Sequence, residues 1–169
     1  MLRIVVMGVS GCGKSSVGAA LSKALDIPYV DADDLHSPAN VDKMAKGIPL
    51  QDEDRWPWLT QVGEVLRDRA PVIVGCSSLK HRYRQLMRDI VREGGTGGDI
   101  RFVHLAAPRE VIETRMAARA GHFMPVSLLD SQYAALEAPD EMEALTVDIS
   151  QSLPQITAFI LQDLSASAR

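Results

Sequence analysis

The sequence predicts an α/β fold in which helices cover both faces of a parallel β-sheet. Short apolar segments rich in β-branched residues alternate with segments whose apolar residues recur at helical spacing, as strands and helices do in such folds. A glycine-rich loop between the first strand and the first helix is the second observation, because such loops bind phosphate. The length of 169 residues suits one domain with its own core, so we expect a single domain over residues 1–169.

Each expected strand is a short apolar run, and each expected helix is an amphipathic segment between two such runs. The strands are expected at residues 2–7, 27–30, 72–74, 102–105 and 145–149. Helical spacing of apolar residues covers 17–25, 59–69, 86–91, 111–116, 128–136 and 156–164, and a shorter helix ends at Gly47. Ligands of parallel sheets bind beyond the carboxyl ends of the strands, so the residues that follow each strand are the first candidates for a site.

Residues 8–15 (Gly-Val-Ser-Gly-Cys-Gly-Lys-Ser) match G-x-x-x-x-G-K-[ST], a phosphate-binding loop. Its glycines let backbone N–H groups turn toward phosphate oxygens, and the following helix directs its positive end at the same anion. We expect Lys14 at the β- and γ-phosphates of a nucleoside triphosphate and the Ser15 hydroxyl on Mg²⁺. A chance glycine-rich turn is the alternative, which the flanking strand and helix disfavour. The nucleotide-binding candidates are Gly8, Val9, Ser10, Gly11, Cys12, Gly13, Lys14, Ser15 and Ser16.

Composition and charge argue against several other classes of protein. A formal net charge of −4 disfavours general nucleic-acid binding, which needs a basic face. Cys12 and Cys76 have no metal-ligand spacing, and we interpret Cys12 as a small loop residue rather than a redox-sensitive thiol. No apolar run is as long as a membrane span and no signal peptide is recognised, so we expect a cytoplasmic protein without membrane or nucleic-acid partners.

Carboxylates follow the second expected strand. Asp31 and Asp33 are two residues apart, so strand geometry places them on the same side. A kinase for hydroxyl groups needs one carboxylate near Mg²⁺ and another at the acceptor hydroxyl, and we assign these tasks to Asp31 and Asp33 in that order. The alternative is that these residues only cap a turn, as we expect for Asp34. His36 either bonds a substrate hydroxyl or packs against the loop.

Basic side chains lie near the ends of later elements. Arg55 is a candidate for gripping a substrate carboxylate, because a guanidinium can do so through two parallel hydrogen bonds. Ser77 follows the third strand, and Lys80 and Arg84 lie close to the same strand end on one helical face, where they could hold an anionic substrate. A solvated basic face is the alternative and is preferred for Arg88. We interpret Trp56 and Trp58 as packing residues.

A pair of arginines precedes an expected lid. Arg115 and Arg119 are four residues apart on a predicted helix that runs into residues 120–125, a segment that resembles a hinge. Phosphoryl transfer needs positive charge at the transferred group, and a lid around residues 119–127 would bring that charge while it excludes water. A solvent-exposed arginine pair is the alternative.

These motifs together resemble those of gluconate kinases (gluconokinases) of the small phosphate-loop type. The resemblance covers nearly the whole chain, and the segments after Asp33 and around His122 are its most specific parts. It rests on residues 7–15, 31–36, 40, 43–44, 49–50, 52, 54–55, 57–59, 76–80, 83–84, 119 and 121–123. The resemblance implies a nucleoside-monophosphate-kinase-like fold, a homodimer, and ATP-dependent phosphorylation of D-gluconate on its terminal hydroxyl to give 6-phosphogluconate.

The resemblance and the motifs together give each candidate a role. Lys14, Asp33 and Arg119 are the expected catalytic residues, Arg115 joins the loop in binding the phosphates, and Ser15 and Asp31 support Mg²⁺. The substrate-binding candidates are Asp33, His36, Arg55, Ser77, Lys80, Arg84 and His122. Two alternatives remain open at this point: a related small-acceptor kinase, such as a shikimate or adenylylsulfate kinase, and an ATP-binding module without an acceptor. A GTPase switch is disfavoured, because D-x-x-G and N-K-x-D elements are absent.

Overall fold

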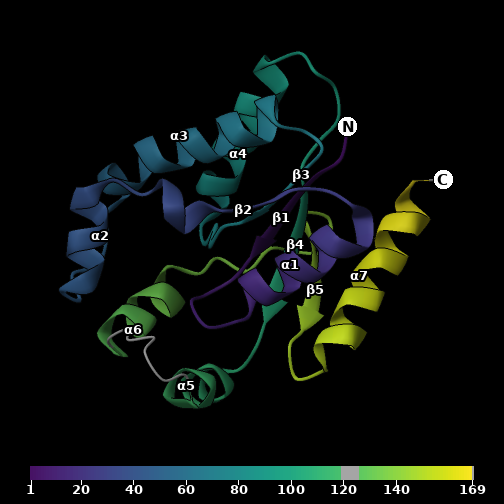
Figure 1. Ribbon diagram of the computed structural model, residues 1–169. Helices are drawn as coiled ribbons and strands as arrows, with labels where there is room; N and C mark the ends of the chain where they lie inside the picture. Colours follow the sequence, from purple (N-terminus) through teal and green to yellow (C-terminus); the bar gives the residue numbers. More distant parts are fainter. Residues whose placement is uncertain (119–125, 169) are drawn as a thin grey trace.

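A computed structural model describes residues 1–118 and 126–168. Its centre is a sheet in the order β2-β3-β1-β4-β5, with every adjacent pair parallel (Figure 1). The five strands are β1 Arg3–Met7, β2 Tyr29–Asp31, β3 Val72–Gly75, β4 Arg101–Ala106 and β5 Ala144–Asp148. β1 lies in the middle and is buried along its whole length, which explains the apolar run at residues 4–7; Arg3 at the start of the strand is buried as well.

Helices cover both faces of the sheet, as predicted from the sequence. The helices are α1 Lys14–Leu25, α2 Pro38–Ala45, α3 Asp52–Asp68, α4 His81–Glu93, α5 Arg109–Ala118, α6 Val126–Ala135 and α7 Leu153–Ser167. Figure 1 shows α3 and α4 together on one face and α1 and α7 on the other. Side chains of β1 point alternately to the two faces of the sheet and so contribute to two separate cores. Val5 and Met7 belong to the core under α3 and α4. Ile4 and Val6 belong to the core under α1 and α7.

The second strand is shifted from its expected place. It begins at Tyr29 and continues to Asp31, whose backbone pairs with Gly75 of β3. A 3₁₀ turn, Ala32–Leu35, follows at once, so Asp33 belongs to a turn and not to a strand. The Asp31 carboxylate caps this turn by accepting the Asp33 N–H at 2.9 Å. The cap expected as an alternative is therefore present.

The carboxyl ends of the strands meet at one edge of the sheet and place the candidate residues together. The phosphate-loop motif leaves β1 at this edge, Asp31 ends β2, and Ser77 lies two residues beyond β3. A backbone hydrogen bond from the Gly8 N–H to the Ser77 carbonyl, at 3.2 Å, joins two of these loops directly. Within residues 1–118 and 126–168, no helix is long and apolar enough to cross a membrane.

Candidate active site

The loop between β1 and α1 needs glycine at defined positions. The φ angles of Gly8, Gly11 and Gly13 are +144°, +80° and +98°, values that residues with a Cβ atom rarely adopt. At Gly8, a Cβ atom would also lie 2.7 Å from the Cys12 sulfur and 2.8 Å from the Leu105 carbonyl oxygen. The glycines of the motif thus permit both the bend of the backbone and its close packing.

The Lys14 ammonium folds back over this loop. Its Nζ donates hydrogen bonds to the carbonyls of Gly8 and Val9, both at 3.0 Å. Lys14 is also the first residue of α1, so the ammonium and the free N–H groups of the first helical turn converge on one place. This concentration of donors and positive charge suits the terminal phosphates of a nucleotide.

Two oxygen atoms beside the loop fit a magnesium ion. The Ser15 hydroxyl lies 3.4 Å from Asp31 Oδ2, so a serine and a carboxylate oxygen face the same point. Both are ligand types that Mg²⁺ prefers, and Mg²⁺ commonly keeps several waters and phosphate oxygens as further ligands. No group of three or more His, Cys, Asp or Glu side chains that could hold a metal occurs in the described part of the chain.

A cavity of about 90 Å³ joins the phosphate loop to the residues expected to hold an acceptor. It brings together six of the candidates predicted from the sequence: Ser10, Lys14, Asp33, His36, Arg55 and Ser77. Its other lining residues are Met44, Pro49, Leu50, Trp58, Leu79, Leu128, Ser131 and Gln132. We call this cavity the acceptor cleft.

The surroundings of Asp33 change the acidity of its carboxyl group. Its side chain is open to solvent, yet the surrounding protein limits hydration of its charge, and this desolvation raises its pKa. The Lys14 ammonium opposes the shift, while the carboxylates of Asp31 and Asp34 add to it. Asp33 therefore holds a proton more strongly than an ordinary aspartate, close to the loop lysine.

His36 both packs and lines the cleft. Its ring stacks on the Trp58 indole with centroids 4.0 Å apart and an interplanar angle of 17°. Trp58 is itself fixed, because its Nε1 donates to the Ala32 carbonyl at 2.7 Å. Burial, and then the charge of Arg55, lower the His36 pKa to about 4, so the imidazole is neutral at pH 7. The His36 Nδ1 atom lies 3.3 Å from the Asn40 amide nitrogen.

Arg55 offers a guanidinium edge to the cleft. Its NH1 group donates to the Leu50 carbonyl at 2.7 Å and to the Tyr83 hydroxyl at 3.2 Å. Among the residues with assigned positions, Nε and NH2 of Arg55 make no hydrogen bond or ion pair. The guanidinium is thus held at one nitrogen, while its remaining donors suit a carboxylate.

Lys80 lines a second cavity, of about 240 Å³, that shares Pro49, Leu50, Arg55 and Ser131 with the acceptor cleft. Its ammonium is 3.3 Å from Asp52 Oδ1. Asp52 also accepts hydrogen bonds from the Tyr83 hydroxyl and from Arg82, and the Tyr83 bond is the main cause of its lowered pKa. Lys80 therefore lines the same cavity as Arg55 and shares its charge with Asp52 at the start of α3.

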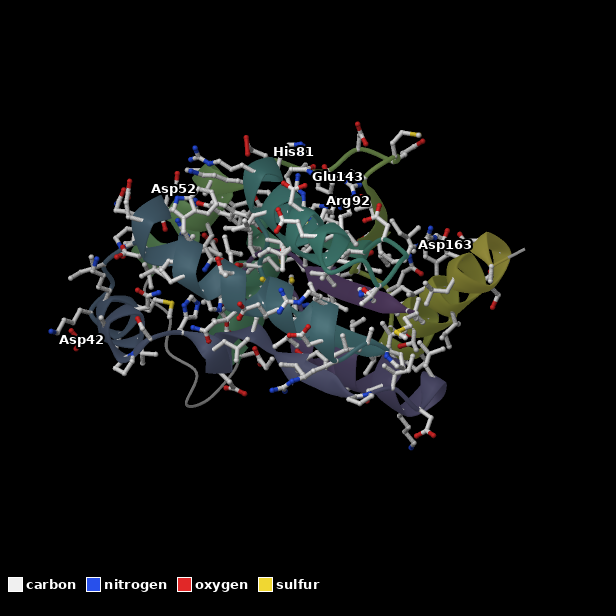
Figure 2. All side chains as sticks on the ribbon, turned by 90° about the horizontal axis from the view of Figure 1, so that it is seen from above. Asp42, Asp52, His81, Arg92, Glu143 and Asp163 are labelled. Atoms are coloured by element: carbon white, nitrogen blue, oxygen red, sulfur yellow. The ribbon has the colours of Figure 1, made fainter. Side chains whose placement is uncertain are left out.

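The structure does not bring Arg84 to the acceptor cleft, contrary to our expectation. Its side chain is 1% exposed and forms a fork with Glu143, with Nε and NH2 at 2.7 and 3.0 Å from the carboxylate oxygens. The remaining donors bond the carbonyls of Ser78, Leu79 and Glu137. Helical spacing predicts Arg84 on the same helix face as Lys80, but at Arg84 this face is covered by other parts of the protein. The same Glu143 carboxylate lies beside His81 of α4 (Figure 2).

Arg115 lies beside the phosphate loop. Its NH1 is the nearest atom to the position of a Cβ on Gly13, at 3.9 Å, and its NH2 donates to the Ile149 carbonyl at 2.6 Å. The backbone after β5 thus holds this arginine at the nucleotide side of the loop. Arg119 and His122, and most of the expected lid, lie outside the described residues.

Comparisons with known proteins place this chain in a family. Residues 4–139 match the family model described as an AAA domain. A gluconokinase of Arabidopsis thaliana is 41% identical to it, with 97% of this chain and 93% of the relative covered. The thermosensitive gluconokinase of Escherichia coli (strain K12) is 42% identical, with coverages of 90% and 82%. The chain belongs to the gluconokinase family.

Solved structures agree with membership of the gluconokinase family. The crystal structure of a gluconokinase from Sinorhizobium meliloti 1021 has a TM-score of 0.85 and 44% identity, covering 99% of this chain and 98% of that one. A shikimate kinase from Bacteroides thetaiotaomicron has a TM-score of 0.72 at only 17% identity, and covers 97% and 98% of the two chains. The second likeness shows the kinase fold alone.

For this gluconokinase-family chain, sequence reasoning missed the wall of the acceptor cleft formed by α6. Leu128, Ser131 and Gln132 line the cleft, and none of them was among the candidates. The available signal was a polar residue, Gln132, within the apolar helical spacing of residues 128–136. Such a residue faces other parts of the protein instead of solvent, and here it meets the phosphate loop.

Proposed function

We propose that this protein transfers the γ-phosphoryl group of ATP to the terminal hydroxyl of D-gluconate, giving 6-phospho-D-gluconate. The observation that carries the proposal is the acceptor cleft, where a phosphate-loop lysine, a carboxylate of raised pKa and an arginine line one cavity. Gluconokinases from a plant and from bacteria are similar to this chain over most of its length, which supports gluconate as the acceptor.

The donor half of the proposed site is the loop between β1 and α1. Lys14 exchanges its bonds to the loop carbonyls for phosphate oxygens, and Arg115 adds positive charge beside Gly13. Ser15 and Asp31 are the residues that would hold Mg²⁺, which when bound neutralises charge on the phosphates. Arg119 and a lid over residues 119–127 remain part of the proposal, with His122 on the substrate side.

The acceptor half is the opposite wall of the cleft. Arg55 binds the gluconate carboxylate through its unpaired edge, and Lys80 supports the anion from the neighbouring cavity. His36 and Ser77 contact hydroxyl groups; the neutral imidazole accepts from the Asn40 amide at Nδ1, so its Nε2 can donate a hydrogen bond to a substrate hydroxyl. Asp33 orients the terminal hydroxyl and takes its proton as the hydroxyl oxygen bonds to the γ-phosphorus and the bond from that phosphorus to the ADP oxygen breaks. In a loose transition state this orientation supplies most of the acceleration.

An acceptor survey tests the function. ADP release is measured by a coupled assay with gluconate, shikimate, adenylylsulfate and nucleoside monophosphates, and the product is identified by phosphorus NMR. We expect turnover with gluconate and a phosphate ester at its terminal carbon. Stronger turnover with another acceptor, or ADP release that no acceptor stimulates, would refute the proposal.

The proposal extends to assembly and conditions. We propose a homodimer of single-domain chains that acts in the cytoplasm and requires Mg²⁺. Light scattering in solution tests the dimer. Titration of activity with Mg²⁺ at fixed ATP tests the metal, and activity that is unchanged after chelation would remove the metal from the mechanism.

A further inference from the structure

A residue of α6 is bonded directly to the phosphate loop. The Ser10 N–H donates to Gln132 Oε1 at 2.6 Å, across 122 positions of sequence. Both residues line the acceptor cleft together with Lys14 and Asp33. The contact therefore lies where the donor and acceptor halves of the proposed site meet.

The chemistry of the contact fixes the orientation of the Gln132 amide. A backbone N–H can only donate, so the side-chain atom facing Ser10 is the carbonyl oxygen. Ser10 is the third residue of the G-x-x-x-x-G-K-S loop, whose backbone N–H groups form the phosphate cradle. Gln132 occupies the N–H of Ser10 itself and thus holds the backbone of the loop at this position, on the side where the acceptor binds.

The helix that carries Gln132 is itself anchored to the sheet edge. Tyr133 donates its hydroxyl hydrogen to the Ala107 carbonyl just after β4, at 3.3 Å. Beyond the end of α6, the Glu137 N–H donates to the Leu79 carbonyl at 2.8 Å, and Arg84 bonds the Glu137 carbonyl at 3.0 Å. These hydrogen bonds hold α6 against the edge of the sheet. Gln132 can therefore fix the position of the phosphate loop relative to α6.

We propose that Gln132 is a positioning residue for phosphoryl transfer. Acting through the Ser10 backbone, it sets the place of the phosphate loop relative to the acceptor cleft. The inference rests on the proposed function, because it assigns Gln132 a task in the transfer between the two halves of that site. A displacement of reacting groups by about 1 Å can lower a rate by about 100-fold. Loss of the hydrogen bond between Ser10 and Gln132 can therefore lower kcat.

Two substitutions with different chemistry test this role. Gln132→Met keeps the length of the side chain but removes the acceptor, and we expect kcat to fall about 10- to 100-fold with the KM for gluconate and the melting temperature unchanged. Gln132→Glu keeps an acceptor for the Ser10 N–H but places a negative charge beside the bound triphosphate. We expect it to raise the KM for ATP about tenfold or more.

Gln61, exposed on α3, provides the matched controls Gln61→Met and Gln61→Glu, which should behave as the unmodified enzyme. A Gln132→Met enzyme with unchanged kcat would overturn the inference, as would a loss of kcat that only follows a lowered melting temperature. A Gln132→Glu enzyme with an unchanged KM for ATP would show that Gln132 lies away from the phosphates. If the unmodified enzyme fails to use gluconate, the proposed function fails; calorimetric titration of Gln132→Glu with ATP then still tests the placement.

Discussion

The imidazole of His36 lies against the indole of Trp58, with ring centroids 4.0 Å apart. This stacking joins the turn after β2 to α3, since Trp58 belongs to the helix and also bonds the Ala32 carbonyl. It sets one side of the acceptor cleft and shields part of His36 from water. The contact has a consequence for stability as well as for the site.

The lowered pKa of His36 predicts a specific pH dependence of stability. The unfolded chain, with an ordinary histidine pKa of about 6.5, takes up a proton before the folded chain does at about 4. The stabilisation from neutral His36 is therefore complete above about pH 6.5 and is lost as the pH falls toward 4. Urea unfolding of the unmodified protein and of His36→Gln should show a difference that shrinks across this window. A difference that is constant with pH would contradict the prediction.

The raised pKa of Asp33 predicts opposite effects of Asp33→Asn on rate and on stability. The substitution removes the group that orients the hydroxyl and accepts its proton, so we expect kcat to fall about 100- to 10,000-fold. It also removes a charge that the folded state disfavours. The variant should therefore melt at a higher temperature at pH 7, and this advantage should vanish below the ordinary aspartate pKa. Calorimetry at pH 7 and at a pH below the ordinary aspartate pKa measures the difference in melting temperature. Asp34→Asn is the neighbouring control.

Arg55 should determine the preference for a carboxylate on the acceptor. Arg55→Ala should raise the KM for gluconate about 10- to 100-fold, because a hydrogen bond to a charged group is lost, while the KM for ATP stays unchanged. The sharper measurement compares gluconate with glucitol, the uncharged polyol of equal chain length. The unmodified enzyme should favour gluconate strongly, and Arg55→Ala should not. A preserved preference would assign the carboxylate to another residue.

The fork between Arg84 and Glu143 should contribute to stability and not to substrate affinity. Arg84→Met leaves a largely buried carboxylate without its main partner, so we expect a loss of about 3–5 kcal/mol in the free energy of unfolding. Replacing both partners, as in Arg84→Met with Glu143→Leu, should recover much of that loss. Urea denaturation measures both variants. The exposed pair of Arg67 and Asp68 is the control, and a loss at Arg84 no larger than that from Arg67→Ala would contradict the assignment.

The sheet and the donor loop could be predicted because their signals are local. An apolar strand, three glycines and a Lys-Ser pair followed by a helix occupy neighbouring positions, and the backbone requirements of Gly8 and Gly13 follow from the motif itself. The order of the strands was not readable, because pairing partners such as Ile4 and Arg101 are distant in sequence. The fold class was nevertheless predicted, since the alternation of elements does not depend on that order.

The acceptor side was less predictable, because burial there is decided by packing between distant segments. Helical spacing predicts Arg84 and Lys80 on one face of a helix. Packing of residues 137–143 against α4 buries Arg84, however, while Lys80 lines a cavity. Gln132 gave only a weak signal, and its partner Ser10 lies far away in the chain. Arg119 and His122 lie outside the described residues, so their roles stay predictions from the sequence.

The bonds of Lys14 to the loop carbonyls determine what nucleotide binding involves. The ammonium already has two acceptors at 3.0 Å, so its contacts with phosphate replace existing bonds and do not simply add to them. The contribution of Lys14 to affinity is then the difference in free energy between its hydrogen bonds to phosphate oxygens and its hydrogen bonds to the loop carbonyls. Because the loop holds its shape through these bonds before the ligand arrives, little ordering entropy is lost on association. Nucleotide capture is thus an exchange of hydrogen-bond acceptors on a preorganised frame.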